Sequence, residues 1–516
     1  MDLIKKAMKK KTYITRLFIL LFSIGMLTGC DFYDVNPENG LKEVDYYRDR
    51  NDLNAGAFGI YAALTPEVHK FLLWGSARAD MVTIGKEGAD AYVTEFVNNN
   101  VTTLNPYTNY AGLYKTIARC NRQLEHIAEV EQLDKTMSQN DFNAYYGEAY
   151  FVRGLCYFYL VRTFQEFPLI LEDISENITY TDENGQVVKM NTLSLTEDEL
   201  RAVALKAADK QKVWEVIISD VKKAMSLLRT NYNWNGVGSL PVEQKYGRAT
   251  LVSAYALACE VALWTDRFSQ ASAYADLVVN ASGYDVGSAG TWSSQFYNRW
   301  ASPYSMFLIG YSYDGSMETN RLQEFTSPFT EDGGKYLLKP AKQVVDSIFS
   351  DAADVRIAGS YKRIDKQDMI WKYIGQDDKK AMRAPYRSDA SWNLIRTSDI
   401  LLWKGIIENR LGNLPGAYYF LNKVRAQRGL DEYNRDEITL TKEEMEDLLF
   451  MERARELAFE GQRWYDLLFM ETVLKKEGAL SSAVAQKYPK AERAAMKTWL
   501  ADESHWYLPI DPTLWK

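Results

Sequence analysis

Two stretches of the sequence share a helix–turn–helix outline, and this repeat restricts the possible folds more than any other feature. Residues 248–282 contain a helical pattern, a short turn at 265–267 and a second helical pattern. Residues 396–429 repeat that outline around a turn at 412–415. Each unit is close to the roughly 34 residues of a tetratricopeptide repeat, and such units bury their apolar faces only by stacking on neighbours. We therefore predict a mainly α-helical protein, organised as a tetratricopeptide-like α-α superhelix.

The helical patterns do not cover the chain evenly. They occupy roughly residues 45–70, 107–282 and 390–516, which we predict to form one helical-repeat scaffold. Residues 283–389 differ, because Gly- and Ser-rich turns and aromatic residues replace the helical pattern, with a strand-like run at 305–311. Insertions on a rigid scaffold often carry binding residues. We therefore expect a single domain over the mature chain, with an irregular, loop-rich insertion.

One long helical pattern, at residues 441–470, places carboxylates where apolar side chains are expected. It begins with a capping box, in which Thr441 and Glu444 satisfy each other's backbone N–H groups. In a continuous helix, Glu452 and Glu456 would extend a stripe of apolar residues. An uncompensated buried charge costs several kcal/mol, so both carboxylates need cationic partners.

These carboxylates have two interpretations. In the first, Glu452, Glu456 and Arg463 belong to a structural ion network, to which Arg425 from another helix is a further candidate partner. In the second, Glu452 and Glu456 are the catalytic pair of a glycoside hydrolase. The structural interpretation is favoured, because the glutamates share one short helix and the sequence shows no cleft around them. We therefore do not predict an enzyme.

The N-terminus has the features of a bacterial export signal. A basic region precedes an apolar run at 17–27, which is too short to span a bilayer comfortably. Leu-Thr-Gly-Cys at 27–30 resembles a lipobox, which implies removal of residues 1–29 and lipidation of Cys30, for example with palmitate. The alternative is an ordinary signal peptide with a coincidental cysteine. Removing the six basic residues and one acidic residue of 1–29 changes the formal net charge from −8 to −13, which does not favour nucleic acid as a partner.

The sequence has no pattern typical of a cofactor or metal site. A Walker A loop, a strand-led GxGxxG, HExxH and GxSxG are all absent. Cys120, Cys156 and Cys259 lie far apart within helical patterns, which favours buried free thiols, with a single disulfide as the alternative. We therefore expect no cofactor and no metal ion.

Six motifs follow the lipobox in order along the mature chain. They are the start of the mature chain at 30–37, GEAYFVRGLCYFYLVRTFQEFPL at 147–169, GRATLVSAYALACEVAL at 247–263, IRTSDILLWKGIIENRLGN at 395–413, ERARELAFEGQRWYDLL at 452–468 and YLPIDP at 507–512. Together they resemble the SusD/RagB family of surface lipoproteins of Bacteroidetes. A departure is Trp403-Lys404-Gly405, which stands where members often carry an acidic partner.

The resemblance implies a SusD-like fold, no catalysis and a role in nutrient uptake. We expect a lipid-anchored, carbohydrate-binding protein at the cell surface of the outer membrane, working with a SusC-like TonB-dependent transporter in oligosaccharide uptake. Its partners would be that transporter, an oligosaccharide and the membrane. A tetratricopeptide-like scaffold that binds peptide or protein is the main alternative, and a glycoside hydrolase is the third.

A sugar site needs an aromatic face against the ring CH groups and planar polar side chains on the hydroxyls. The sequence offers such residues in two regions, an early loop-like stretch and the irregular insertion. Each also has the plainer interpretation of a core residue, because Trp and Tyr more often fill cores than touch ligands. The candidate ligand-binding residues are Trp74, Arg78, Asp80, Tyr92, Asn98, Trp292, Trp300 and Tyr311.

Overall fold

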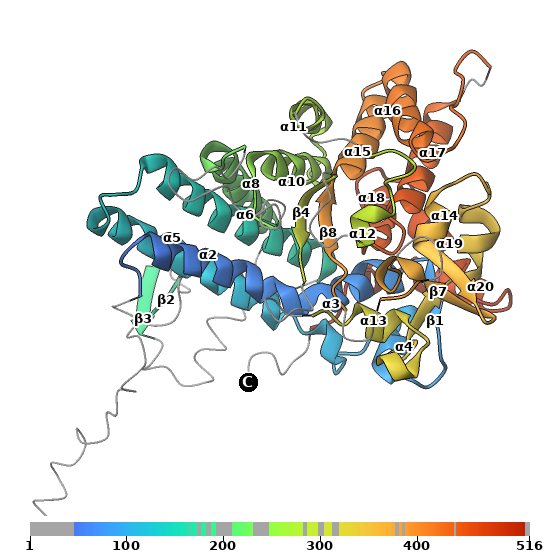
Figure 1. Ribbon diagram of the computed structural model, residues 1–516, viewed down its shortest axis with the longest axis horizontal. Coiled ribbons are helices and arrows are strands. Elements are labelled where there is room, and N and C mark those ends of the chain that lie inside the picture. The colour runs from blue at the N-terminus through green and yellow to red at the C-terminus, as the bar shows by residue number, and fades with distance from the viewer. Residues whose placement is uncertain are drawn as a thin grey trace, which may run out of the picture. The chain divides into compact units, whose positions relative to one another are not determined.

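The helical scaffold expected from the repeat is present in the computed structural model, and successive long helices from α2 to α17 pack side by side (Figure 1). The units at 248–282 and 396–429 are the helix pairs α10–α11 and α15–α16, so the predicted fold class is confirmed. The long helices are α2 (Arg50–Leu64), α5 (Ala111–Leu133), α6 (Gln139–Thr163), α8 (Lys210–Leu227), α10 (Leu251–Trp264), α11 (Phe268–Val279), α15 (Thr397–Arg410), α16 (Leu414–Ala426), α17 (Lys442–Glu456) and α18 (Arg463–Thr472).

The structure describes most of the chain, with gaps. The described residues are 46–164, 166–172, 177–181, 187–191, 209–230, 247–281, 286–297, 304–311, 319–376, 381–383, 388–437 and 440–510. Apart from 46–48, they belong to one unit of the chain, Asp49–Lys516. Among these residues no helix combines the length and the apolar character that crossing a bilayer requires.

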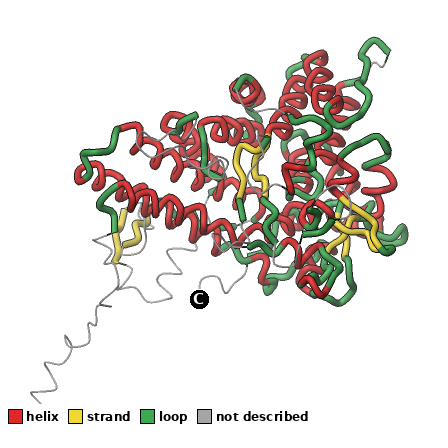
Figure 2. Tube along the Cα trace, viewed as in Figure 1, coloured by secondary structure: helices red, strands yellow, loops and turns green. Residues whose placement is uncertain are grey.

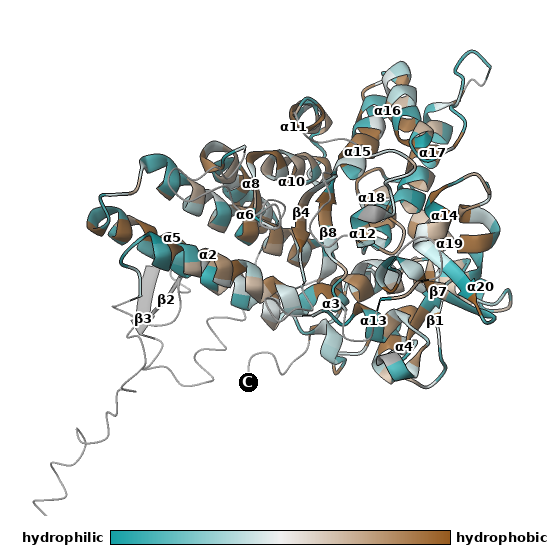
Figure 3. Ribbon diagram, viewed as in Figure 1, coloured by the Kyte–Doolittle hydropathy of each residue, from teal (hydrophilic) through white to brown (hydrophobic). Residues whose placement is uncertain are grey.

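Side-chain caps define where several helices begin. The capping box predicted at Thr441 and Glu444 is present at the start of α17, and Thr250 with Ser253 forms another at the start of α10. Each box satisfies two backbone N–H groups that have no partner within the helix. Helix α10 is buried on nearly all sides because α8 and α11 flank it. Figure 3 shows that strand β4 (Ser305–Ile309) is apolar. Helix α20 (Arg493–Trp499) has no buried residue and lies at the surface.

The long helix predicted at 441–470 is in fact two helices, α17 and α18. The chain leaves the helical conformation after Glu456, and Phe459 and Gly461 have left-handed φ angles of 66° and 73°. The break allows the backbone of Gly461 to lie against Gly75, where a Cβ atom would be 1.7 Å from the Gly461 carbonyl oxygen. The predicted helix face therefore ends at Glu456, and Arg463 belongs to the next helix and not to that face.

The irregular insertion contains short elements instead of a second domain core. Its strands belong to two-stranded antiparallel pairs, which Figure 2 shows in yellow. Strand β6 pairs with β7 inside the insertion, whereas β5 pairs with β1 (Val82–Ile84) and β4 with β8 (Trp392–Arg396), both outside it. The predicted strand at 305–311 is β4, and its partner β8 leads directly into α15. The elements of the insertion are α12 (Ser294–Tyr297), β4 (Ser305–Ile309), α13 (Leu322–Thr326), β5 (Leu338–Pro340), α14 (Arg356–Ser360), β6 (Tyr361–Ile364) and β7 (Gln367–Ile370). A separate hairpin pairs β2 (Asn177–Thr181) with β3 (Val187–Asn191).

Residues 65–110, which contain the first group of predicted site residues, are more helical than the sequence indicated. They comprise α3 (Val68–Leu72), a π-helical turn at Leu73–Ala77, strand β1 (Val82–Ile84) and helix α4 (Ala91–Val97). The C-terminal segment with α19 (Ala479–Ala485) and α20 returns to this region. The π-helical turn is buried, and this includes the predicted site residue Trp74.

Candidate functional site

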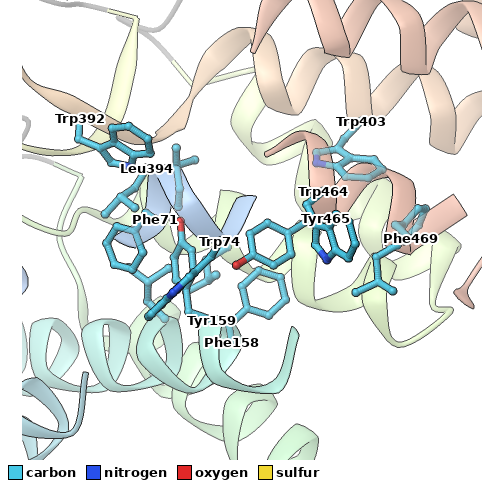
Figure 4. Close-up of a cluster of buried hydrophobic side chains, with 14 of the residues drawn as sticks. Phe71, Trp74, Phe158, Tyr159, Trp392, Leu394, Trp403, Trp464, Tyr465 and Phe469 are labelled. Carbon is cyan, nitrogen blue, oxygen red and sulfur yellow. The ribbon is translucent and has the colours of Figure 1, made fainter. Parts of the chain in front are cut away.

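Three of the predicted aromatic residues lie in the core. Trp74 has no exposed surface, and its indole N–H donates to the carbonyl oxygen of Tyr107 at 2.8 Å. In Figure 4 it lies within the buried aromatic cluster, next to Phe71. Trp292 donates to Glu456 Oε1 at 3.3 Å, and the Tyr311 hydroxyl donates to a backbone oxygen at 2.6 Å. A side chain without exposed surface cannot lie against a sugar ring, so these three residues belong to the scaffold.

Arg78 and Asp80 are also buried, and both connect distant segments. The Arg78 guanidinium lies 3.8 Å from the Trp464 ring centroid and donates to the carbonyl oxygens of His505 and Trp506 at 2.7 and 2.9 Å. Burial lowers its pKa to about 9. Asp80 accepts two hydrogen bonds from Arg463, each 2.9 Å long. The Arg78 Nη atoms and the Asp80 carboxylate are occupied inside the protein, and Arg78 Nε is buried without a partner among the described residues, so both side chains are structural.

Tyr92 and Asn98, in contrast, lie at the two ends of the surface helix α4. Tyr92 is 44% exposed at its first turn, and Asn98 is the half-buried residue that ends it. Asp90 caps the N-terminus by accepting from the backbone N–H of Val93. Of the eight predicted ligand residues, these two are the ones that the described structure leaves accessible. Trp300 and the lipidation candidate Cys30 lie outside the described residues.

A fixed polar network continues from α4 towards α13. Asp90 Oδ2 accepts from the Tyr107 hydroxyl at 3.4 Å, and Arg321 forms two bonds with Glu324 at 2.8 and 3.1 Å. Tyr107 and Arg321 both contact His69, since the Tyr107 and His69 ring centroids are 5.7 Å apart and Arg321 Nη1 lies 3.5 Å from His69 Nε2. Lys335 supplies Glu324 with a further bond at 2.6 Å. Planar polar groups are thus held in place by a series of contacts that begins at Asp90, two positions before the exposed Tyr92.

Electrostatic interactions keep Glu324 ionised and His69 neutral. Burial works against ionisation of Glu324, but the bonds from Arg321 and Lys335 outweigh it and lower its pKa. Burial, and next the charge of Arg321, lowers the pKa of His69 to about 3, so its ring is neutral. Arg321 Nη1 then donates to His69 Nε2 at 3.5 Å. The arginine is oriented on several sides while its side chain remains 46% exposed.

We call Asp90, Tyr92, Asn98, Tyr107, Arg321 and Glu324 the α4 surface. Sequence reasoning found Tyr92 and Asn98 but missed the others. Arg321 and Glu324 are more than 200 positions away from Tyr92, and an Arg-x-x-Glu spacing occurs on many helices without any functional role. Only the fold brings them near α4, so no local pattern could have identified them.

The glutamates of α17 form a closed ion network. Glu456 accepts from Arg428 at 2.9 Å twice, from Arg396 at 2.7 Å and from Arg356 at 3.1 Å. Burial opposes its charge, but Arg428 and then Arg396 prevail and hold its pKa well below the ordinary range. Glu456 is therefore ionised and has no proton to donate as a general acid.

Glu452 is paired in the same way. It contacts Arg356 at 2.7 Å, Arg455 at 3.1 Å and Arg425 at 3.3 Å, so the candidate partner Arg425 does contribute. Arg463 does not join either glutamate, because the chain break places it beside Asp80. Both carboxylates are fully enclosed, and a hydrolytic pair would need access to water and substrate.

The described part of the chain shows no cluster of His, Cys, Asp and Glu that could hold a metal ion. Cys120, Cys156 and Cys259 are free, buried thiols, each within a different helix. Burial raises the pKa of the Cys259 thiol well above its ordinary value, so it stays protonated and unreactive.

Comparison with known proteins gives matches over nearly the whole chain. Residues 354–513 match a family described as the SusD family, and residues 31–263 match one described as starch-binding associating with outer membrane. SusD-like protein P38 of Formosa agariphila is 24% identical, and the alignment covers 92% of this chain and 94% of that protein.

Solved structures agree with this fold. A SusD superfamily protein from Bacteroides vulgatus superposes with a TM-score of 0.70 at 20% identity, covering 91% of this chain and 97% of the other. A protein described as a laminarin-binding SusD-like protein superposes with a TM-score of 0.65 at 18% identity, with the same coverage of both chains.

Proposed function

The chain belongs to the SusD/RagB family of non-catalytic, glycan-binding proteins associated with the outer membrane, and we propose that it captures an oligosaccharide for a SusC-like TonB-dependent transporter. In this role the helical scaffold is a rigid support and the α4 surface is where the glycan binds. The ligand would pass from this surface to the transporter at the cell exterior.

The observation that carries this proposal is the exposed ring of Tyr92 on α4, whose neighbour Asp90 is connected through Tyr107 and His69 to the oriented Arg321–Glu324 pair. Sugar rings have apolar CH faces and hydroxyl groups around their edge, so they are recognised by an aromatic face together with planar hydrogen-bonding groups. Among the described residues Arg321 donates three hydrogen bonds, and a guanidinium carries five N–H groups, so two remain for a ligand. The α4 surface therefore combines the two chemistries that a sugar requires.

Membrane attachment would come from Cys30. The lipobox-like sequence ends at this residue, and the match to the starch-binding family begins immediately after it, at residue 31. Lipid on Cys30 would hold the protein at the membrane without a spanning helix. If Cys30→Ala left the distribution between membrane and culture medium unchanged, this attachment would be refuted.

Glucan binding is the first test, because one solved relative is described as laminarin-binding. We would titrate the purified mature protein with laminarin oligosaccharides and a panel of other glycans by calorimetry. Tyr92→Ala should weaken binding about tenfold, as expected for loss of an aromatic contact. Tyr419→Ala is the matched control, because Tyr419 is 59% exposed on α16.

The alternatives make different predictions in the same experiment. Binding to a peptide panel without binding to any glycan would favour the peptide-binding scaffold and refute the proposal. Release of reducing sugar by the purified protein would indicate a hydrolase. Equal affinities of Tyr92→Ala and wild type would show that the α4 surface is not the glycan site.

A further inference from the structure

Trp499, at the end of α20, is the second feature that points to a ligand. Its side chain is 43% exposed, whereas Trp74, Trp292 and Trp392 are almost completely buried. Its neighbours in the sequence include the exposed polar residues Lys497 and Thr498 on the same helix and Asp502 after it. An isolated aromatic ring among polar groups is too small an apolar area for a stable protein interface, but it suits one sugar ring.

The ring of Trp499 is held in place. Its indole N–H donates to the carbonyl oxygen of Asn99 at 3.0 Å. His505 stacks on it, with ring centroids 3.4 Å apart and planes 18° from parallel. An exposed aromatic side chain with a fixed orientation loses little conformational freedom when a ligand binds, which favours affinity.

His505 is itself fixed against the indole. Its Nδ1 lies 2.8 Å from the carbonyl oxygen of Trp499, and a carbonyl can only accept, so Nδ1 donates this hydrogen bond. Because His505 stacks on one face of the indole, a sugar ring would have to use the opposite face.

Trp499 also adjoins the α4 surface. The carbonyl group to which it is bonded belongs to Asn99, the neighbour of the α4-surface residue Asn98. Asn99 is itself fixed, because its side chain donates to the Arg78 carbonyl oxygen at 3.0 Å. Helix α4 has seven residues, which corresponds to about 10 Å between Tyr92 and this end of the surface. One sugar ring could not reach both ends, but a short chain of sugars could.

We propose that Trp499, held by His505, forms a second contact site for the glycan, at the end of the α4 surface opposite Tyr92. The apolar face of a hexopyranose ring would lie on the face of the indole opposite His505, and His505 would keep the indole in that orientation. This inference rests on the proposed function, and it adds that the preferred ligand is an oligosaccharide long enough to extend along α4.

The test is a series of laminarin oligosaccharides of increasing length, titrated into the mature protein by calorimetry. Wild type should bind the longer members more tightly. Trp499→Ala should weaken binding of the longer members about tenfold and leave the shortest binding member unchanged. His505→Ala should have a smaller effect of the same kind, and Tyr419→Ala none.

Hydroxyl-radical footprinting measures the oxidation of individual side chains. If Trp499 had only a structural role, its oxidation would not change when a ligand binds. Oxidation of Trp499 should fall when a long oligosaccharide binds, while oxidation of Tyr419 should not change. Equal affinity of Trp499→Ala and wild type for the long oligosaccharides would overturn this inference but not the proposed function. The same would follow if Trp499→Ala weakened binding equally for every oligosaccharide length and the bound ligand did not protect Trp499 from oxidation. No binding of wild type to any member would refute the glucan proposal and this inference with it.

Discussion

Arg463 and Asp80 lie 383 positions apart and are joined by two hydrogen bonds, each 2.9 Å long. The pair links the start of α18 to the segment before β1, and both side chains are buried. A sequence pattern that treats 441–470 as one helix assigns Arg463 to Glu452 or Glu456 instead. The partner of Arg463 is therefore determined by a long-range contact of the fold and could not be inferred from helical periodicity.

Asp80→Asn should strongly destabilise the protein. The change leaves the buried Arg463 guanidinium without a compensating charge, which costs about 3–5 kcal/mol of unfolding free energy. Denaturant unfolding at pH 7 would measure it. The control is Lys342→Gln, because Lys342 forms an exposed pair with Asp346 at 3.7 Å, and its loss should cost under about 1 kcal/mol. Similar losses in both variants would contradict the structural role of Asp80.

Gly75→Ala should prevent stable folding. A Cβ atom at this position would lie 1.7 Å from the backbone oxygen of Gly461, and a backbone atom cannot move aside as a flexible side chain would. We expect a loss of more than about 3 kcal/mol, or insoluble protein. Gly290→Ala is the control, since a Cβ atom there meets nothing within 4 Å. Circular dichroism melting curves of the two variants would show the difference.

Acid should destabilise the protein partly through Glu456. Its folded-state pKa is lowered well below the ordinary 4.5, with Arg428 as the main stabilising partner against burial. Its contribution is therefore fully present above pH 4.5 and is lost as the pH falls towards the folded-state pKa. Glu456→Gln should be less stable at pH 7 by about 3–5 kcal/mol, with a flatter decline below pH 4.5. Parallel acid profiles of variant and wild type would rule this out.

Glu260 should have the opposite effect on the pH dependence of stability, because it should destabilise the folded protein as the pH rises. Burial, and next the charge of Asp399, raises its pKa to about 8, so the folded protein keeps a proton that the unfolded chain releases above its ordinary value of 4.5. The resulting stabilisation is complete below pH 4.5 and is lost as the pH rises through about 8.

Glu260→Gln resembles the protonated form and tests this expectation. The variant should match wild type at pH 4.5 to within about 1 kcal/mol and become increasingly more stable than wild type as the pH rises to 9. Thermal midpoints measured across this range would show the divergence. A variant that is less stable than wild type at pH 9 would mean that Glu260 is ionised and usefully paired, most directly with Arg162 at 3.9 Å.

Trp74→Ala should affect stability rather than recognition. Removing this fully buried ring leaves a cavity in the aromatic cluster and should cost about 3–5 kcal/mol of unfolding free energy. Tyr92→Ala removes an exposed ring and should cost under about 0.5 kcal/mol. Differential scanning calorimetry of both variants decides between the two roles. A nearly unchanged thermal midpoint for Trp74→Ala would mean that Trp74 is not a core residue and is again a candidate for ligand contact.

Much of the fold was predictable because it depends on local patterns. The pairs α10–α11 and α15–α16 follow from helix periodicity and repeat length, and the cap at Thr441 follows from residue spacing. The need for cations around the α17 carboxylates was also evident, since burial of an unpaired charge is costly. Of their partners, Arg425 was identified, but Arg356, Arg396 and Arg428 were not, because their elements approach α17 only in the folded chain.

The candidate site was much less predictable. Trp74 and Tyr92 look alike in sequence, as aromatic residues in a stretch without clear periodicity, yet one is buried and the other exposed. The difference arises from a π-helical turn that docks on the break after α17, which no local pattern indicates. Arg321 and Trp499 reach α4 from distant parts of the chain for the same reason.

The attachment made by Arg78 has a consequence for substitutions in the segment that it holds. Arg78 holds the C-terminal segment through main-chain oxygens of positions 505 and 506, and the side chains there take no part in that bond. A substitution at 505 would therefore keep the two bonds from Arg78, but it would remove the ring that stacks on Trp499. The main-chain attachment of the segment and the orientation of its exposed indole thus depend on different parts of the same residue.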